Sequence, residues 1–258
     1  MSDARVKPVE VGPYLNPAAL ARPEGVHITG LEVVTISGQS GTLKSSVAKE
    51  LATILGINLS RRGGDLRASL RADTGEEVLG RVPIEHTRDQ ELDALTECEI
   101  EAAHVQQHPC IIEGRLAAII LNKVRSRHVS DPVRALSVLI VSANDAKREH
   151  RIYKRQQQKG TVTDAEVAVK TAERHESDAE RWRRQYGSIL QDKDPFDPSL
   201  VDTKGQFVYD LPLLIDHQQD SLTIPSDATR EAVVVTILEE LCNRGLISMP
   251  VGRREETA

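Results

Sequence analysis

The segment between residues 31 and 56 constrains the fold of this chain more than any other. Residues 31–37 (Leu-Glu-Val-Val-Thr-Ile-Ser) are β-branched and mostly apolar, which is typical of a strand buried on both faces. Residues 44–55 carry apolar side chains at helical spacing, and Gly56 follows where a helix would end. A turn with the sequence Gly-Gln-Ser-Gly-Thr-Leu-Lys-Ser, residues 38–45, joins the two. We therefore predict a strand, a turn and a helix in the order that a phosphate-binding loop requires.

The turn matches the phosphate-binding pattern at all but one position. That pattern is Gly, four residues and then Gly-Lys-Ser/Thr; Gly38, Lys44 and Ser45 have this spacing, but Leu43 replaces the second glycine. The backbone N–H groups of such a loop and the helix N-terminus bind phosphate oxygens. We expect Lys44 to reach the terminal phosphates and the Ser45 hydroxyl to ligate Mg²⁺. A positive φ at Leu43 costs about 1–2 kcal/mol, and Gly41 supplies some of the lost flexibility. The alternative is an ordinary strand-to-helix turn with a solvated lysine.

Further strands and helices alternate along the chain. Residues 110–113, 135–142 and 209–216 have the character of strands, and Pro212 indicates a strand end, an edge or a bulge in the last of them. Helical patterns lie between them, residues 89–107 among them. Strands that alternate with helices favour parallel pairing, so we predict an α/β fold with a layered parallel sheet.

Two later helices have clear end signals. Thr163-x-x-Glu166 has the form of a capping box, and Gly187 is expected to end that helix. Its arginines at positions 174, 181 and 184 project from one side. The last helix is predicted over residues 228–244, with Gly245 as its stop.

Composition excludes several classes of protein. The formal net charge of −6 does not suit a general nucleic-acid binder. The longest apolar runs are far shorter than the roughly 18 residues that span a membrane, and the N-terminus has no signal-peptide pattern. The three cysteines lie far apart in the sequence and show no metal-binding spacing, and we expect no metal beyond Mg²⁺. We expect a cytoplasmic protein, a monomer or weak oligomer, with no membrane or nucleic-acid polymer as partner.

Residues 36–52 (Ile-Ser-Gly-Gln-Ser-Gly-Thr-Leu-Lys-Ser-Ser-Val-Ala-Lys-Glu-Leu-Ala) resemble the start of cytidylate kinases, a family of nucleoside monophosphate kinases. Other segments resemble later parts of that family in the right order: residues 64–67, 112–117, 147–155, 174–187 and 209–216. The resemblance runs from about Val33 to Leu241 and rests on the order and spacing of these segments rather than on one specific motif.

The resemblance implies a fold and a domain plan. The fold would be a three-layer, P-loop NTPase-type parallel sheet flanked by helices, with a helical lid at about residues 146–163. This domain would occupy residues 31–246, after an N-terminal extension of residues 1–30 and before a polar tail of residues 247–258. The implied reaction is transfer of the γ-phosphoryl group of ATP to CMP or dCMP with Mg²⁺, so the expected partners are small-molecule nucleotides.

Phosphoryl transfer brings several negative charges together, which calls for a lysine, a metal ion and arginines from separate segments. The expected catalytic residues are Lys44, Arg151, Arg174 and Arg181. The expected nucleotide-binding residues are Gly38, Gln39, Ser40, Gly41, Thr42, Leu43, Lys44, Ser45, Ser46 and Arg155. The expected acceptor-binding residues are Asp65, Arg67, Glu113, Gly114 and Arg115. For each charged residue the alternative is a solvated side chain or a local ion pair.

Two other functions remain open on the sequence. Leu43 is compatible with a protein that binds nucleotide but has lost catalysis. The weaker acceptor segments are compatible with a kinase of the same fold that phosphorylates a sugar or another metabolite.

Overall fold

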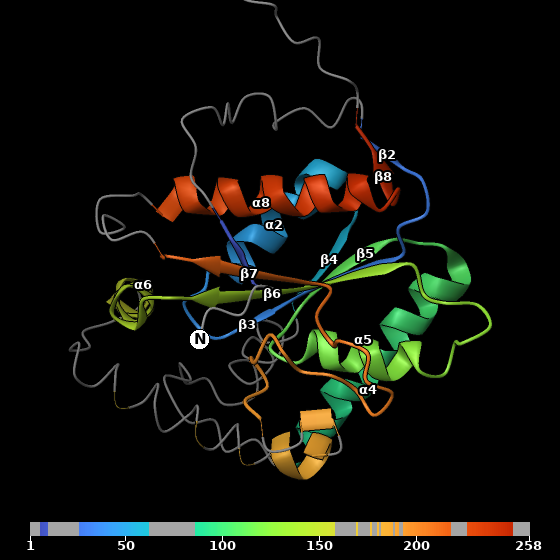
Figure 1. Cartoon of the computed structure of the whole chain (residues 1–258), viewed down its shortest axis with the longest axis horizontal. Coiled ribbons are helices and arrows are strands. Elements are labelled where there is room, and N and C mark those ends of the chain that lie inside the picture. The colour runs from blue at the N-terminus through green and yellow to red at the C-terminus, as the bar shows by residue number, and fades with distance from the viewer. Residues whose placement is uncertain are drawn as a thin grey trace, which may run out of the picture.

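Six strands form one parallel sheet in the order β1-β7-β6-β3-β5-β4 (Figure 1). This computed structural model describes residues 6–9, 26–61, 86–157, 193–217 and 226–249, and also 169, 176, 180, 182–187 and 189–190. The strands of the sheet are β1 (Lys7–Pro8), β3 (Val33–Gly38), β4 (Asn58–Arg61), β5 (Cys110–Glu113), β6 (Ala135–Ser142) and β7 (Leu211–Ile215). A separate antiparallel pair joins β2 (His27–Ile28) to β8 (Ile247–Ser248).

Helices cover both faces of the sheet, so the molecule has three layers (Figure 1). On one face lie α2 (Lys44–Leu55) and α8 (Ser226–Asn243), and on the other lie α4 (His86–Gln106) and α5 (Ala117–Arg125). A fifth helix, α6 (Asp145–Gln157), lies beyond the arrowheads of β6 and β7. The predicted three-layer α/β fold with a parallel sheet is confirmed.

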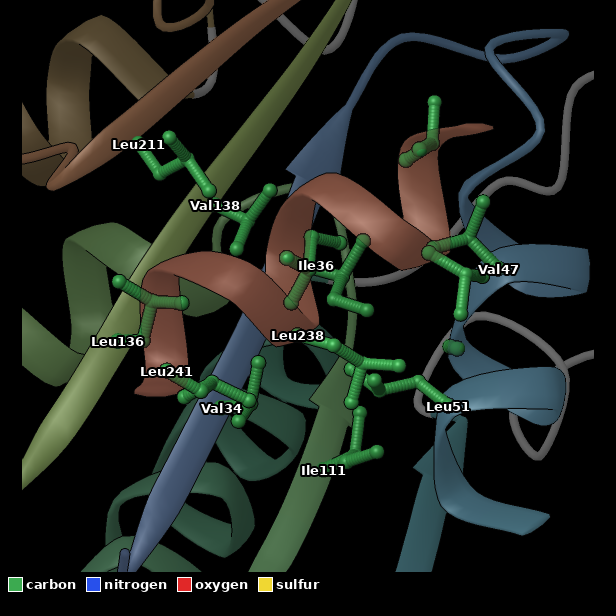
Figure 2. Close-up of a cluster of buried hydrophobic side chains, with 14 of the residues drawn as sticks. Val34, Ile36, Val47, Leu51, Ile111, Leu136, Val138, Leu211, Leu238 and Leu241 are labelled. Carbon is green, nitrogen blue, oxygen red and sulfur yellow. The ribbon is translucent and has the colours of Figure 1, made fainter. Parts of the chain in front are cut away.

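The core divides into two apolar clusters, one on each face of the sheet. Figure 2 shows the first, where Val34 and Ile36 of β3 meet Leu238 and Leu241 of α8 and Leu51 of α2. The second lies between the sheet and α4 and α5, and it also includes residues from the segment after α6. All six residues of β3 are buried, because this strand is central and has a helical layer on each side.

Most local predictions agree with the observed elements. The bounds predicted for α2, β5 and β6 are those observed, and α2 ends at Gly56 with a left-handed φ of 64°. Strand β3 begins two residues later than expected, and α4 and α8 begin a few residues earlier. Among residues 1–30, Lys7 and Pro8 add an edge strand beside β7, where the N–H of Val9 donates to Leu214 O at 2.9 Å. The domain bounds at residues 31 and 246 stay predictions.

Pro212 is the second residue of β7, and so lies near the start of the strand as predicted. The carbonyl of Leu214 points to β1, and backbone groups two residues apart in a strand point to the same side. The nitrogen of Pro212 therefore faces away from β6, ahead of the pairs that join β1 to Leu213 and Leu214. This position tolerates a residue without an N–H.

The prediction that Gly187 ends a helix is wrong. Residues 187, 189 and 190 are all helical, and Leu190 is fully buried in the second core cluster. Burial of a leucine side chain contributes about 1.5–3 kcal/mol, whereas a glycine inside a helix costs about 1 kcal/mol. Packing of Leu190 therefore outweighs the local stop signal.

Candidate functional site

The turn between β3 and α2 lies at the carboxyl end of the central strand, where open α/β sheets bind ligands. Its backbone has positive φ at Gly38 (144°), Gly41 (85°) and Leu43 (64°). The two glycines are also required for space. A Cβ at Gly38 would lie 2.4 Å from the carbonyl oxygen of Ile140, and one at Gly41 would lie 2.5 Å from that of Arg148. The loop is thus pressed against β6 on one side and α6 on the other.

Leu43 adopts the left-handed conformation that glycine usually supplies, with φ 64° and ψ 0°. The conformational cost is about 1–2 kcal/mol. Its side chain packs against the core cluster under α2 and α8, and this burial offsets part of the cost. The carbonyl of Leu43 accepts hydrogen bonds from Ser46 N–H and Val47 N–H, both at 3.0 Å, so α2 begins regularly. A leucine in place of the usual glycine is therefore compatible with a regular start of α2.

Three successive loop carbonyls, of residues 39–41, accept hydrogen bonds from side chains. The donors are Thr42 Oγ1 and Lys44 Nζ to Gln39 O (2.9 and 3.1 Å), Arg148 Nη1 to Ser40 O (3.4 Å) and Arg151 Nη1 to Gly41 O (3.1 Å). The C=O and the following N–H of a trans peptide point in opposite directions. The N–H groups of Gly41 and Thr42, which follow the carbonyls bound by Arg148 and Arg151, therefore point away from α6. Successive N–H groups turned to one side are what a phosphate-binding loop requires.

Lys44 lies between the loop and a buried carboxylate. Its Nζ is 3.8 Å from Glu113 Oε1, and the two side chains are only 11 % and 7 % exposed. Glu113 ends β5 and pairs in register with Ile36 of β3 and Arg61 of β4. Arg61 Nε lies 4.0 Å from Glu113 Oε2, so this carboxylate has a cation on each side.

Arg61 was not among the expected site residues. It belongs to a run of four arginines, at positions 61, 62, 67 and 71, in which no local signal distinguishes it. Its proximity to Glu113 follows from the pairing of β4 with β5, which joins residues 52 positions apart, as 113 minus 61 gives. Arg61 could have been identified as a site residue only from knowledge that β4 pairs with β5 in this register.

Arg115 extends from the turn after β5 to the loop. Its Nη2 donates to Ser40 Oγ at 2.9 Å, and its Cζ lies 5.7 Å from the ring centroid of Trp182. Trp182 is almost fully buried and contacts Phe196 edge to face, with ring centroids 5.9 Å apart. The aromatic ring thus supports a guanidinium group directly beside the loop.

The loop also contacts the carboxyl end of β7 through Arg151 of α6. Arg151 forms two hydrogen bonds to the Asp216 carboxylate, one of them 2.9 Å long, in addition to its bond to Gly41 O. Ser142 Oγ donates to Asp216 at 2.7 Å, and Lys147 Nζ lies 3.7 Å from it. Burial raises the pKa of the Asp216 carboxyl, but its bonds to Arg151 and Ser142 and the nearby cations lower the pKa more, so it lies below the ordinary value.

The structure brings most of the expected residues of the described chain to one edge of the sheet. Ser45 is half-buried and Ser46 exposed in the first turn of α2, and Gly114 N–H donates to Ile36 O at 3.3 Å. Arg155 lies on an exposed part of α6, beyond Arg151. The alternative of a local ion pair fits Arg184, whose Nη2 is 3.8 Å from Glu180 Oε1. The expected residues outside the described part of the chain are Asp65, Arg67, Arg174, Arg181 and lid residues 158–163.

Two other classes of site, a metal cluster and a membrane span, are absent from the described residues. These residues contain no group of three or more His, Cys, Asp or Glu side chains that could hold a metal ion. None of their helices has the length and apolar character needed to cross a membrane.

Comparisons with known proteins identify the fold and no family. No protein-family model and no curated protein matches the sequence. A crystal structure of an uncharacterized protein from Eubacterium ventriosum has a TM-score of 0.50 and 17 % identity, covering 81 % of this chain and 98 % of that one. A putative kinase from Chloroflexus aurantiacus has a TM-score of 0.46 and 14 % identity (83 % and 97 % covered). The shikimate kinase from Acinetobacter baumannii with shikimate has a TM-score of 0.40 and 14 % identity (83 % and 94 % covered). The first of these similarities, with 17 % identity, is a similarity of fold.

Fold and loop together define a three-layer α/β protein with a P-loop type turn at the carboxyl end of its central strand. The uncharacterized protein from Eubacterium ventriosum is similar in fold to 81 % of this chain.

Proposed function

We propose that this protein transfers the γ-phosphoryl group of ATP to a small-molecule acceptor. The observation that carries the proposal is the loop of residues 38–43, whose carbonyls are all turned toward side-chain donors over residues 39–41. Its N–H groups and the N-terminus of α2 together form a site for the oxygens of a polyphosphate. Lys44, the first residue of α2, supplies a positive charge beside this loop, with its Nζ 3.1 Å from Gln39 O.

The chemistry needs charge neutralisation more than it needs covalent participation by the protein. The bond between the γ-phosphorus and the β–γ bridging oxygen breaks, a bond to the acceptor oxygen forms, and ADP leaves. Lys44 would stabilise negative charge on the transferred group. Mg²⁺ bound with the nucleotide would neutralise further phosphate charge, and the hydroxyl of Ser45 in the first turn of α2 is the side chain suited to hold it.

We propose CMP or dCMP as the acceptor. Two guanidinium groups, of Arg61 and Arg115, lie near the loop on the side of β4 and β5, where they would bind the phosphate of a monophosphate acceptor. The resemblance of residues 64–67 and 112–117 to cytidylate kinases supports the same acceptor. Asp65 and Arg67 would complete its binding, and Arg174 and Arg181 would approach the transferred group from the helix that follows the lid.

A second acceptor class is favoured by Glu113. This buried carboxylate lies beside Lys44, where it could take a proton from an acceptor hydroxyl. A phosphate acceptor needs no such base, because its oxygen is already ionised. A sugar or another hydroxylated metabolite is therefore the alternative substrate.

An ADP-release assay distinguishes these acceptors. The panel contains CMP, dCMP, UMP, AMP, GMP and unphosphorylated sugars and hydroxy acids, with Mg²⁺ and ATP. Preferred turnover of CMP or dCMP supports the nucleotide acceptor, and turnover confined to a hydroxylated metabolite supports the alternative. Folded protein that binds ATP by calorimetry but turns over no acceptor would instead favour a nucleotide-binding protein without catalysis. Activity gained in Leu43→Gly would support that last function.

We also propose that the lid of about residues 146–163 closes over bound phosphates and excludes water, which limits wasteful hydrolysis. Limited proteolysis with and without Mg²⁺ and ATP tests closure. Cleavage within the lid should slow when ATP is bound, and unchanged cleavage there would contradict closure.

A further inference from the structure

A carboxylate with no exposed surface lies at the end of β7, outside the expected site. Asp216 has a left-handed backbone φ of 60°, and its side chain is 0 % exposed. It accepts hydrogen bonds from Arg151 and Ser142 and lies near Lys147 Nζ. Burying a carboxylate is costly unless it is paired, so this arrangement is built around the partners of Asp216.

The main partner of Asp216 also contacts the phosphate loop. Arg151 Nη1 donates both to Asp216 Oδ2 at 2.9 Å and to Gly41 O at 3.1 Å. A planar guanidinium that is fixed by two bonds to one carboxylate has little freedom to turn. The Asp216 carboxylate therefore determines where the donor to Gly41 O lies.

The bond to Gly41 O fixes the orientation of a peptide unit in the loop. Because C=O and N–H point in opposite directions, holding the carbonyl of Gly41 toward α6 turns the N–H of Thr42 toward the opposite side. Gly41 is the loop residue with the greatest backbone freedom between Gly38 and Leu43. This peptide is where an external restraint has the largest effect.

We propose that Asp216 is a positioning residue for the phosphate loop, acting through Arg151 on the Gly41–Thr42 peptide. It lies 65 positions beyond Arg151 and about 175 beyond Gly41, at the end of another strand. In Leu43 this loop already has a residue with a strained φ in place of the usual glycine. The restraint from Asp216 keeps Gly41 and its neighbours in the one conformation that turns their N–H groups to a phosphate.

Hydrogen exchange where the loop joins α2, followed by mass spectrometry, tests the proposal without any nucleotide. The amides of Ser46 and Val47 report on the loop, because both donate to the carbonyl of Leu43. Asp216→Asn removes the charge while keeping the size and left-handed backbone of residue 216. We expect the amides of Ser46 and Val47 to exchange on the order of tenfold faster in this variant, because a loop that has lost a charge-assisted hydrogen bond holds the Leu43 carbonyl less firmly. Arg151→Lys should have the same effect, because one ammonium cannot reproduce the forked contact with both acceptors.

Asp210→Asn is the matched control. Asp210 is also a largely buried carboxylate bound to an arginine, with Arg125 Nη2 at 3.0 Å, but it lies next to the opposite end of β7. This variant should lose stability without faster exchange of the Ser46 and Val47 amides. Unchanged exchange of the Ser46 and Val47 amides in Asp216→Asn and Arg151→Lys would overturn the proposal. An equal increase in the Asp210→Asn control would also overturn it, because the effect would then report general destabilisation.

A second measurement rests on the proposed function. It separates a failure of that function from a failure of the positioning role of Asp216. In Asp216→Asn the KM for ATP should rise on the order of tenfold while the KM for the acceptor stays within about twofold. Loss of a carboxylate with a purely structural role would not raise the KM for ATP while leaving the KM for the acceptor unchanged. If the wild type neither binds nor uses ATP, the proposed function fails, and the exchange result still decides the role of Asp216. A KM for ATP unchanged in Asp216→Asn, with active protein, would contradict the positioning role.

Discussion

At the scale of single residues, Leu43 is the position where local chemistry and backbone conformation conflict. A leucine holds a φ of 64° there, and its side chain packs on the core. Two variants separate these effects, because Leu43→Ala and Leu43→Gly both remove the side chain and only glycine relieves the left-handed strain. We expect Leu43→Gly to be more stable than Leu43→Ala by about 1 kcal/mol, once the extra chain entropy of glycine is subtracted. Urea unfolding measures the difference, and equal stability would mean that residue 43 bears no strain.

Lys44 provides the corresponding test for the proposed chemistry. Lys44→Ala should reduce kcat/KM by about 10²–10³-fold, because a cation is lost where charge develops. The fold should survive, since the contacts of Lys44 are to a loop carbonyl and to Glu113 at the edge of the sheet. Lys49→Ala, at an exposed position of the same helix, is the control and should keep wild-type turnover. Near-normal activity in Lys44→Ala, with unchanged thermal unfolding, would refute the role given to this lysine.

At the scale of elements, α6 is joined to β7 and the loop by charged contacts, which makes its attachment sensitive to pH. The pKa of Asp216 is lowered in the folded state, so its contribution to stability is complete above the unfolded-state value of 3.8. That contribution is lost as pH falls below 3.8, through the lower folded-state pKa. Urea unfolding from pH 7 to pH 2 should give a shallower acid loss for Asp216→Asn than for the wild type. Asp145→Asn alters an exposed carboxylate of the same helix and should leave the wild-type slope.

The order of the elements was far easier to predict than the contacts between them. Periodicity and glycine positions indicated α2, β5 and β6 correctly, because those signals are local in sequence. The partners of Arg61 and Asp216 depend on which strands are neighbours in the sheet, and no local pattern carries that information. The prediction that a helix ends at Gly187 was wrong for a similar reason. The burial of Leu190 against residues distant in sequence outweighed the local stop signal.

At the scale of the whole molecule, the first described residues form the edge strand β1, which pairs with β7, the strand that leads to Asp216. β1 lies beside β7, and Val9, directly after β1, is 4 % exposed within the core cluster under α2 and α8. A polar side chain at this position would be buried among apolar side chains without a hydrogen-bond partner, and it would weaken the attachment of β1 to the sheet. The edge of β7 would then open to solvent along the stretch that ends at Asp216.

Val9→Ser should therefore lower the free energy of unfolding by about 1–3 kcal/mol, from lost apolar burial and an added polar group. Val129→Ser makes the same chemical change at a side chain that is 70 % exposed. It should alter stability by no more than about 0.5 kcal/mol. Urea unfolding compares the two variants, and hydrogen exchange shows where the lost stability lies: β7 amides should exchange faster in Val9→Ser, while those of β4 keep their wild-type rates. Equal stabilities of the two variants would mean that β1 adds nothing to the sheet, and β7 would then be held in place by β6 and α8.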